Sequence, residues 1–255
     1  MAHPYLESAL RLVENFEEGL AEVAASTLVT ACDVGLDLPQ RTGIALWAFV
    51  EQNPGSLVAR QVPDVLNGLP FEAEILLRAS TIVGNPEADE QLFAASMELL
   101  ATRQYASHVE VQVVLAAAEC VRGKHHLWLV PVLARAVHEH GGGLPEDVLR
   151  GLRDAWSCSL DVGKRLEVRE FAELLPVDLD WIELMLADDN YEVRRNVASS
   201  IPSMPTPGAA IPVIDARVDV EHHHAVRAAL ADAKSTVIEQ GERQARRAAR
   251  HGRSR

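Results

Sequence analysis

The residues of this chain best suited to chemistry lie in three clusters of histidines, which could act as ligands of a metal ion. His222, His223 and His224 are consecutive, and consecutive side chains on a helix point about 100° apart, so they cannot all reach one ion. His125-His126 and His138-Glu139-His140 flank an expected helix that is about 20 Å long. They cannot share an ion without ligands from other helices, so we expect no metal site and no cofactor.

The stretch from residue 188 to 198 combines acidic, basic and apolar residues in a regular order. Asp188 and Asp189 precede an expected helix, where their carboxylates would accept hydrogen bonds from unpaired backbone N–H groups. Arg194 is expected to reach back to this pair of aspartates and tie the helix to its turn. Apolar residues follow at a spacing of four, which places them on one helical face: Val193, Val197 and Ile201.

The same element recurs along the C-terminal third of the chain. Val226-Arg227 repeats Val193-Arg194 after 33 residues, and Val168-Arg169 is a looser copy upstream. These copies resemble the HEAT repeat family, over Asp178–Pro202 and Pro207–Ala233 most closely. The resemblance implies helical hairpins that must stack on neighbours to bury their apolar faces. Residues 1–144 lack the signature.

The whole chain is expected to be all-α, because apolar residues recur at helical spacing between Pro, Gly and Asp punctuation. The resemblance implies an α-solenoid of about seven antiparallel helix pairs. We expect one solenoid over residues 1–241, with a possible hinge at 141–143, and a basic, flexible tail over 242–255. The expected helices are 4–18, 20–34, 39–53, 55–67, 71–83, 87–103, 107–122, 126–140, 145–157, 163–175, 178–187, 191–201, 207–218 and 222–240.

Two enzyme families with HEAT-like folds offer an alternative function. Asp154, near Trp156 and Trp181, is similar to the catalytic aspartate among tryptophans in HEAT-like alkylpurine DNA glycosylases. His138-Glu139 has the order of the iron-binding pairs in HEAT-like deoxyhypusine hydroxylases, but no second His-Glu pair occurs. Asp154 is therefore the one candidate catalytic residue, and the tryptophans are also typical core residues.

Charge divides the chain into an acidic body and a basic end. Residues 242–255 hold six arginines and one glutamate, whereas the rest holds 18 Lys and Arg against 36 Asp and Glu, a net charge of −18. The acidic body argues against a broad nucleic-acid groove. The arginines would form one stripe on a helix and could contact nucleic acid, an acidic protein surface or the body itself: Arg243, Arg246, Arg247 and Arg250.

We therefore expect a non-catalytic interaction scaffold that binds a protein partner on the concave face of the solenoid. Its alternatives are the glycosylase-like enzyme and a nucleic-acid-binding regulator that uses the tail. The Arg194 and Arg227 side chains are expected to be structural. The expected partner contacts are polar residues of second helices: Glu192, Arg195, Asn196 and His224.

The expected location is the cytoplasm. No apolar stretch is long enough to cross a membrane, and the N-terminus lacks the pattern of a secretory signal. Cys32, Cys120 and Cys158 are widely spaced and are expected to be buried thiols in a reducing compartment.

Overall fold

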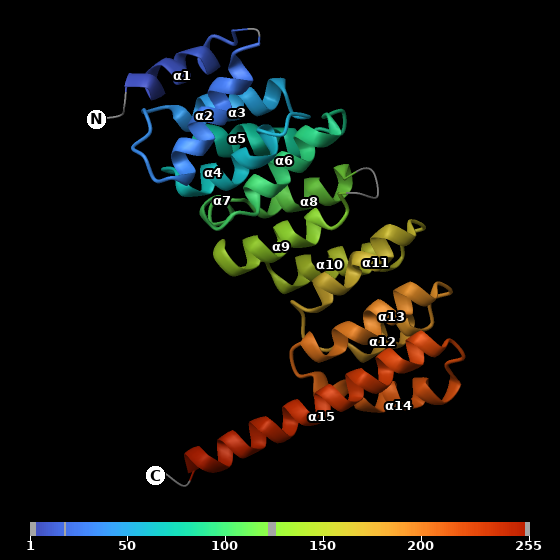
Figure 1. Ribbon diagram of the computed structural model, residues 1–255. Coiled ribbons are helices and arrows are strands. Elements are labelled where there is room, and N and C mark those ends of the chain that lie inside the picture. The colour runs from blue at the N-terminus through green and yellow to red at the C-terminus, as the bar shows by residue number, and fades with distance from the viewer. Residues whose placement is uncertain (1–3, 18, 122–125, 253–255) are drawn as a thin grey trace. The chain divides into compact units, whose positions relative to one another are not determined.

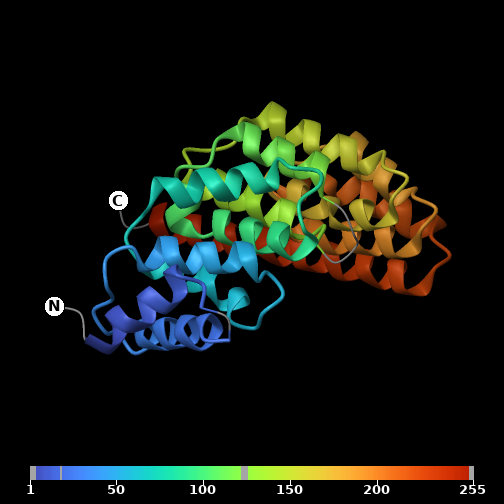
Figure 2. The ribbon, with the colours of Figure 1, turned by 90° about the horizontal axis from the view of Figure 1, so that it is seen from above.

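The computed structural model describes residues 4–17, 19–121 and 126–252, with side chains described up to Arg247. These residues form α-helices, short 3-10 helices and connecting loops, and no strand occurs among them (Figures 1 and 2). The prediction of an all-α chain is confirmed.

The chain divides into two compact units, Met1–Leu144 and Pro145–Arg255. The division follows the glycine run for which the sequence predicts a possible hinge. Gly142 and Gly143 have φ angles of +87° and +92°, which side-chain-bearing residues rarely adopt.

Unit 1 is built from four helix pairs, in which α1 packs on α2, α3 on α4, α5 on α6 and α8 on α9. The second helices also contact one another in the order α2, α4, α6 and α9, which we term the second-helix row of unit 1. The first helices form a matching row of α1, α3, α5 and α8. The elements are α1 (Pro4–Glu14), α2 (Ala21–Asp33), α3 (Thr42–Gln52), η1 (Ala59–Gln61), α4 (Val62–Gly68), α5 (Ala73–Val83), α6 (Glu90–Leu100), α7 (Arg103–Ala106), α8 (Val111–Cys120) and α9 (Leu129–His140).

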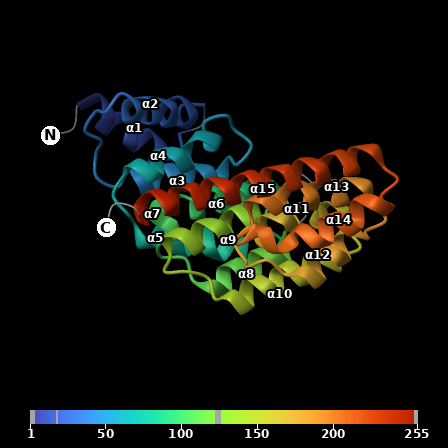
Figure 3. The same cartoon turned by 90° about the horizontal axis from the view of Figure 1, so that it is seen from below.

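Unit 2 contains three helix pairs, α10 with α11, α12 with α13 and α14 with α15. The second helices α11, α13 and α15 lie side by side and form the second-helix row of unit 2 (Figure 3). The elements are α10 (Glu146–Ser157), α11 (Val162–Ala172), α12 (Leu179–Leu186), α13 (Tyr191–Ser200), η2 (Ile201–Ser203), η3 (Pro207–Ala210), α14 (Ile211–Val220) and α15 (His224–Gly252).

Several helix boundaries differ from the expected ones. The first helix ends at Glu14 and not at residue 18, and the short α7 lies between the helices expected over 87–103 and 107–122. The helix expected over 207–218 is η3 followed by α14. The helix expected over 55–67 is the short η1 followed by α4, which begins at Val62 with a proline at its start. The last helix continues well past residue 240, so the segment expected as a flexible tail is helical through Gly252. Ion pairs one turn apart on α15 favour this extension. They join Arg243 to Glu239 and Arg246 to Glu242.

An arginine at the fourth position of each second helix organises the turns of unit 2. The guanidinium donates to a main-chain carbonyl six residues earlier, from Arg165 to Ser159 at 2.8 Å and from Arg194 to Asp188 at 2.7 Å. Arg227 repeats the bond to Glu221 at 3.0 Å through Nε. The three turns therefore share one hydrogen-bonding pattern.

These arginines also join successive turns. Arg165 Nε donates to the carboxylate of Asp188 at 2.8 Å, in the following turn. Arg194 donates through Nε and Nη2 to the carboxylate of Glu221, at 3.1 and 3.2 Å, in the turn after that. Each link crosses from one helix pair to the next, so the ion pairs stabilise the stacking of the pairs.

This pattern corrects two expectations from the sequence. The upstream counterpart of Arg194 is Arg165 and not Arg169, because Arg165 makes the same bond to its own turn. Asp188 does not cap α13; the cap is Asn190, whose side chain accepts from the N–H of Glu192 at 2.8 Å. Asp188 instead accepts from the N–H of Asn190 and from Arg165. Asp189 is almost fully exposed and pairs with Arg165 at 3.3 Å.

Glu221 is the most highly coordinated carboxylate of these turns. It is 2% exposed, accepts from Arg194 and Arg217, and also accepts from the N–H of His223 at 2.9 Å. Burial raises the pKa of this carboxyl, but the backbone and guanidinium donors outweigh burial and lower the pKa from 4.5 to about 2.

Candidate functional site

A groove on the second-helix row of unit 1 is the strongest candidate site, and we term it the α6 groove. It consists of two cavities of about 440 and 380 Å³ that share Arg60 and Glu98 in their linings. The first is lined by Pro54, Arg60, Glu90, Gln91, Ala94, Ala95, Glu98 and His126. The second is lined by Arg60, Pro63, Asp64, Glu98, Ala101, Thr102, Trp128, Leu129 and Val132.

The spacing of residues on α6 explains the floor of the groove. Phe93, Met97 and Leu100 bury one face of this helix in unit 1. The adjoining face carries Glu90, Ala94, Glu98 and, just past the helix end, Ala101. Alanines leave space above the helix, and the segments around η1 and α4 on one side and the start of α9 on the other form the walls. The carboxylates project beside this space.

Two carboxylates in the groove have no opposite charge bound to them. Among the described residues, neither Asp64 nor Glu98 has a hydrogen bond or an ion pair. Partial burial raises the pKa of Glu98, and the nearby Asp64 carboxylate raises it further, while His126 and Arg60 only partly oppose this. A cation bound beside Glu98 would offset the cost of burial and the repulsion from Asp64, and so stabilise both carboxylates in their charged form.

The third carboxylate of the groove, Glu90, lies 3.7 Å from His126 Nε2. Within the described ranges, no group of three or more His, Cys, Asp and Glu side chains is arranged to hold a metal ion. The groove thus offers carboxylates, one arginine and apolar walls, a set suited to recognising a cationic group rather than to positioning a nucleophile.

Sequence reasoning missed the α6 groove because its residues come from three separate segments of a region without the repeat signature. One signal was present in the sequence. Glu90, Ala94, Glu98 and Ala101 follow one another at spacings of four, four and three, so acidic and small residues alternate along one helical face.

Asp154, the candidate catalytic residue, is exposed on α10 of unit 2. Asp154 forms an ion pair with Arg153 at 2.8 Å. Trp156 and Trp181 are buried, at 3% and 5% exposure, and Trp181 Nε1 donates to Ser157 Oγ at 2.8 Å. The two tryptophans therefore belong to the core.

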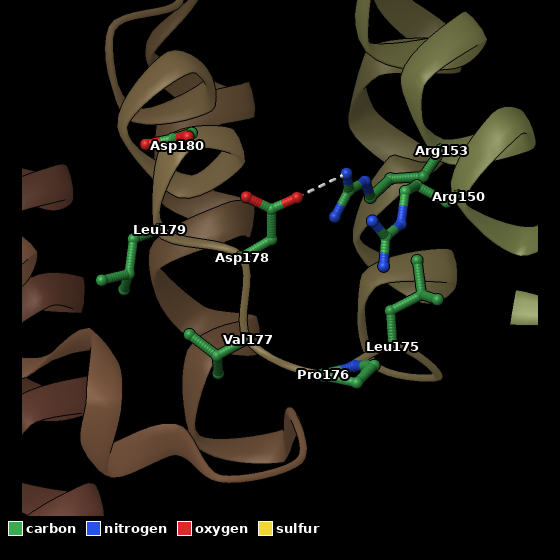
Figure 4. A pocket seen from close by; sticks show the side chains of 8 residues that line it. All are labelled: Arg150, Arg153, Leu175, Pro176, Val177, Asp178, Leu179 and Asp180. Atoms are coloured by element: carbon green, nitrogen blue, oxygen red, sulfur yellow. Dashed lines mark hydrogen bonds and ion pairs between the residues drawn. The ribbon is translucent and has the colours of Figure 1, made fainter. Parts of the chain in front are cut away.

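Unit 2 has a cavity of about 450 Å³ beside this region (Figure 4). Asp178 points toward the guanidinium of Arg153 and pairs with it at 2.8 Å, while Arg150 lies alongside. Burial raises the pKa of Asp178, but the Trp181 N–H and Arg153 lower it below its usual value. The Asp178 and Arg153 charges of this cavity thus neutralise each other, and Arg153 also lies against the ring of Trp181, 5.1 Å from its centre.

The expected partner contacts of unit 2 lie on the second-helix row. Glu192 and Arg195 are exposed on α13, Asn196 is half-buried, and His224 is exposed at the start of α15. A stack of three rings connects the two helices. Tyr191 lies 4.1 Å from His223, and His223 lies 5.2 Å from His224, measured between ring centres.

The expected tail contacts are partly engaged within α15. Arg243 and Arg246 are about three-quarters exposed and pair with glutamates one turn earlier. Arg247 is exposed, as is every residue from 241 to 247. Arg250 lies within α15, but its side chain is outside the described residues, as are Arg253 and Arg255.

The other residues selected from the sequence are dispersed. His125 lies outside the described residues. His138 is half-buried, with its Nδ1 buried and without a hydrogen bond. The expectation of three buried thiols is wrong: Cys158 is exposed, because it lies in the turn after α10, and Cys32 and Cys120 are half-buried. No helix in the described part of the chain is long and apolar enough to cross a membrane.

Comparisons of this chain with protein-family models, with curated proteins and with solved structures find no match.

Proposed function

We propose that the protein is an interaction scaffold of HEAT-like helical pairs, in which second helices present the binding surface to a protein partner. The order of helix contacts in each unit supports a stack of hairpins. The repeated bonds of Arg165, Arg194 and Arg227 support equivalent turns in unit 2.

The observation that carries the proposal is the α6 groove, with the Asp64 and Glu98 carboxylates open to a cation. In unit 2, by contrast, the charged turn residues are bound to one another and serve stability. A scaffold requires an accessible binding surface and a rigid frame. The α6 groove supplies the surface, and the ion pairs between the turns of unit 2 supply rigidity.

Site-specific photo-crosslinking tests this function in cells that produce the protein. A photo-reactive residue at Ala94, on the groove floor, should capture a discrete protein. The same residue at Gln112, exposed on α8 in the first-helix row, is the matched control and should capture none. Equal products from both positions, or none from Ala94, would contradict the proposal.

A further inference from the structure

The occupant of the α6 groove can be inferred from charge, and this step rests on the proposed function. The described groove lining carries three carboxylates, Asp64, Glu90 and Glu98, against one arginine, Arg60, and one histidine, His126, which lies beside Glu90. An occupant that complements this surface must be cationic and narrow enough to lie along a helix.

The chain itself contains such a segment. Residues 242–255 carry six arginines in a chain whose remainder is acidic. In the described part of this segment, α15 is exposed at every residue from 241 to 247. A helical end that packs on nothing is marginal in water, and intrahelical ion pairs offset this only in part. Packing against an acidic surface would stabilise it further.

The dimensions of the two elements are compatible. Glu90 and Glu98 are eight residues apart on α6, about 12 Å along its axis. Arg243, Arg246 and Arg247 cover a little more than one turn of α15, about 6 Å. The arginine stripe can therefore lie beside the carboxylates of the groove, while alanines of both helices allow close approach.

We propose that the α6 groove binds the arginine-rich end of α15 from a second copy of this chain, so that copies associate head to tail. The groove and the arginine stripe are different surfaces, so the interface is heterologous. Such an interface need not close after two copies, and longer assemblies are expected at high concentration.

Two charge-reversal variants of the full chain test this arrangement by analytical ultracentrifugation at about 50 mM salt, where exposed charges are weakly screened. The first carries Asp64→Lys and Glu98→Lys in the groove. The second carries Arg243→Glu, Arg246→Glu and Arg247→Glu on α15. Each should weaken self-association at least about tenfold, because like charges then face each other across the interface. The matched control carries Glu110→Lys, just before α8, and Glu119→Lys on α8, and it should associate as the wild type does.

Mixing the two variants distinguishes this interface from association through any other surface of the chain. The first variant keeps its arginine stripe and the second keeps its groove, so the stripe of the first can bind the groove of the second. The mixture should therefore recover association that neither variant shows alone. A wild-type chain that stays monomeric at about 50 µM and 50 mM salt would overturn the inference. Association that survives both reversals would also overturn it. If self-association fails while Ala94 still captures another protein, the scaffold function stands and only its occupant is wrong.

Discussion

Replacing Glu221 with glutamine should destabilise unit 2 substantially. The substitution keeps the size of the side chain and one oxygen acceptor but removes the charge that Arg194 and Arg217 share. The pKa of this carboxyl falls from 4.5 in an unfolded chain to about 2 in the folded one. At ~1.4 kcal/mol per pH unit, that difference corresponds to about 3 kcal/mol of stability at neutral pH.

The pH dependence has a definite sign. Because folding lowers the pKa of Glu221, its contribution is complete above pH 4.5 and is lost as the pH falls toward about 2. The free energy of unfolding of the wild type should therefore exceed that of the Glu221→Gln variant by the full difference of about 3 kcal/mol at pH 7. The difference should shrink as the pH falls below 4.5.

Hydrogen exchange read by mass spectrometry measures this difference in stability locally, in peptides from α13 and α14. The matched control is Glu239→Gln, which removes an exposed carboxylate from α15 and should change stability by less than about 0.5 kcal/mol. A Glu221→Gln effect as small as that of the control at pH 7 would refute the reasoning. So would a difference that does not shrink between pH 4.5 and pH 3.

Three other perturbations probe the remaining charged contacts. Arg165→Ala should destabilise unit 2 by about 1–3 kcal/mol and Arg169→Ala by less, in urea unfolding, because only Arg165 holds the Asp188 carboxylate. Self-association, measured by sedimentation, should begin to weaken at a pH above 4.5 as the pH falls, because the raised pKa of Glu98 lets this carboxylate become neutral early. Self-association that stays constant down to pH 4 would count against this role of Glu98. Gel shifts should detect no duplex DNA binding with or without residues 242–255, since the body carries a net charge of −18. A salt-sensitive shift seen only with the intact chain would show a nucleic-acid contact instead.

The sequence predicts the all-α fold and the turn element because both depend on neighbouring residues. Helical spacing, proline and glycine punctuation, and the Val-Arg pattern around Arg194 are local signals. The register of the upstream copy was wrong because the pattern at Arg169 resembles that of Arg194. The defining property is a bond from the arginine to a carbonyl six residues earlier, and only the structure places that bond at Arg165.

The candidate site could not be predicted in the same way. The α6 groove combines residues near 54–64, 90–102 and 126–132, and tertiary packing alone brings these segments together. The role of Glu221 was hidden for the same reason, since its partner Arg194 is 27 residues away. The basic composition of residues 242–255 predicts a tail, whereas α15 continues through Gly252, because Glu and Arg at a spacing of four favour a helix.

In the proposed function, the carboxylates of the α6 groove bind a protein partner. The most direct measurement is the yield of the photo-crosslinked product from Ala94 in the wild type and in an Asp64→Asn, Glu98→Gln variant. Because these substitutions remove two negative charges and little volume, the yield should fall at least about tenfold while helical content stays unchanged. A yield equal to that of the wild type would show that the groove carboxylates do not recognise the partner, and would contradict the account.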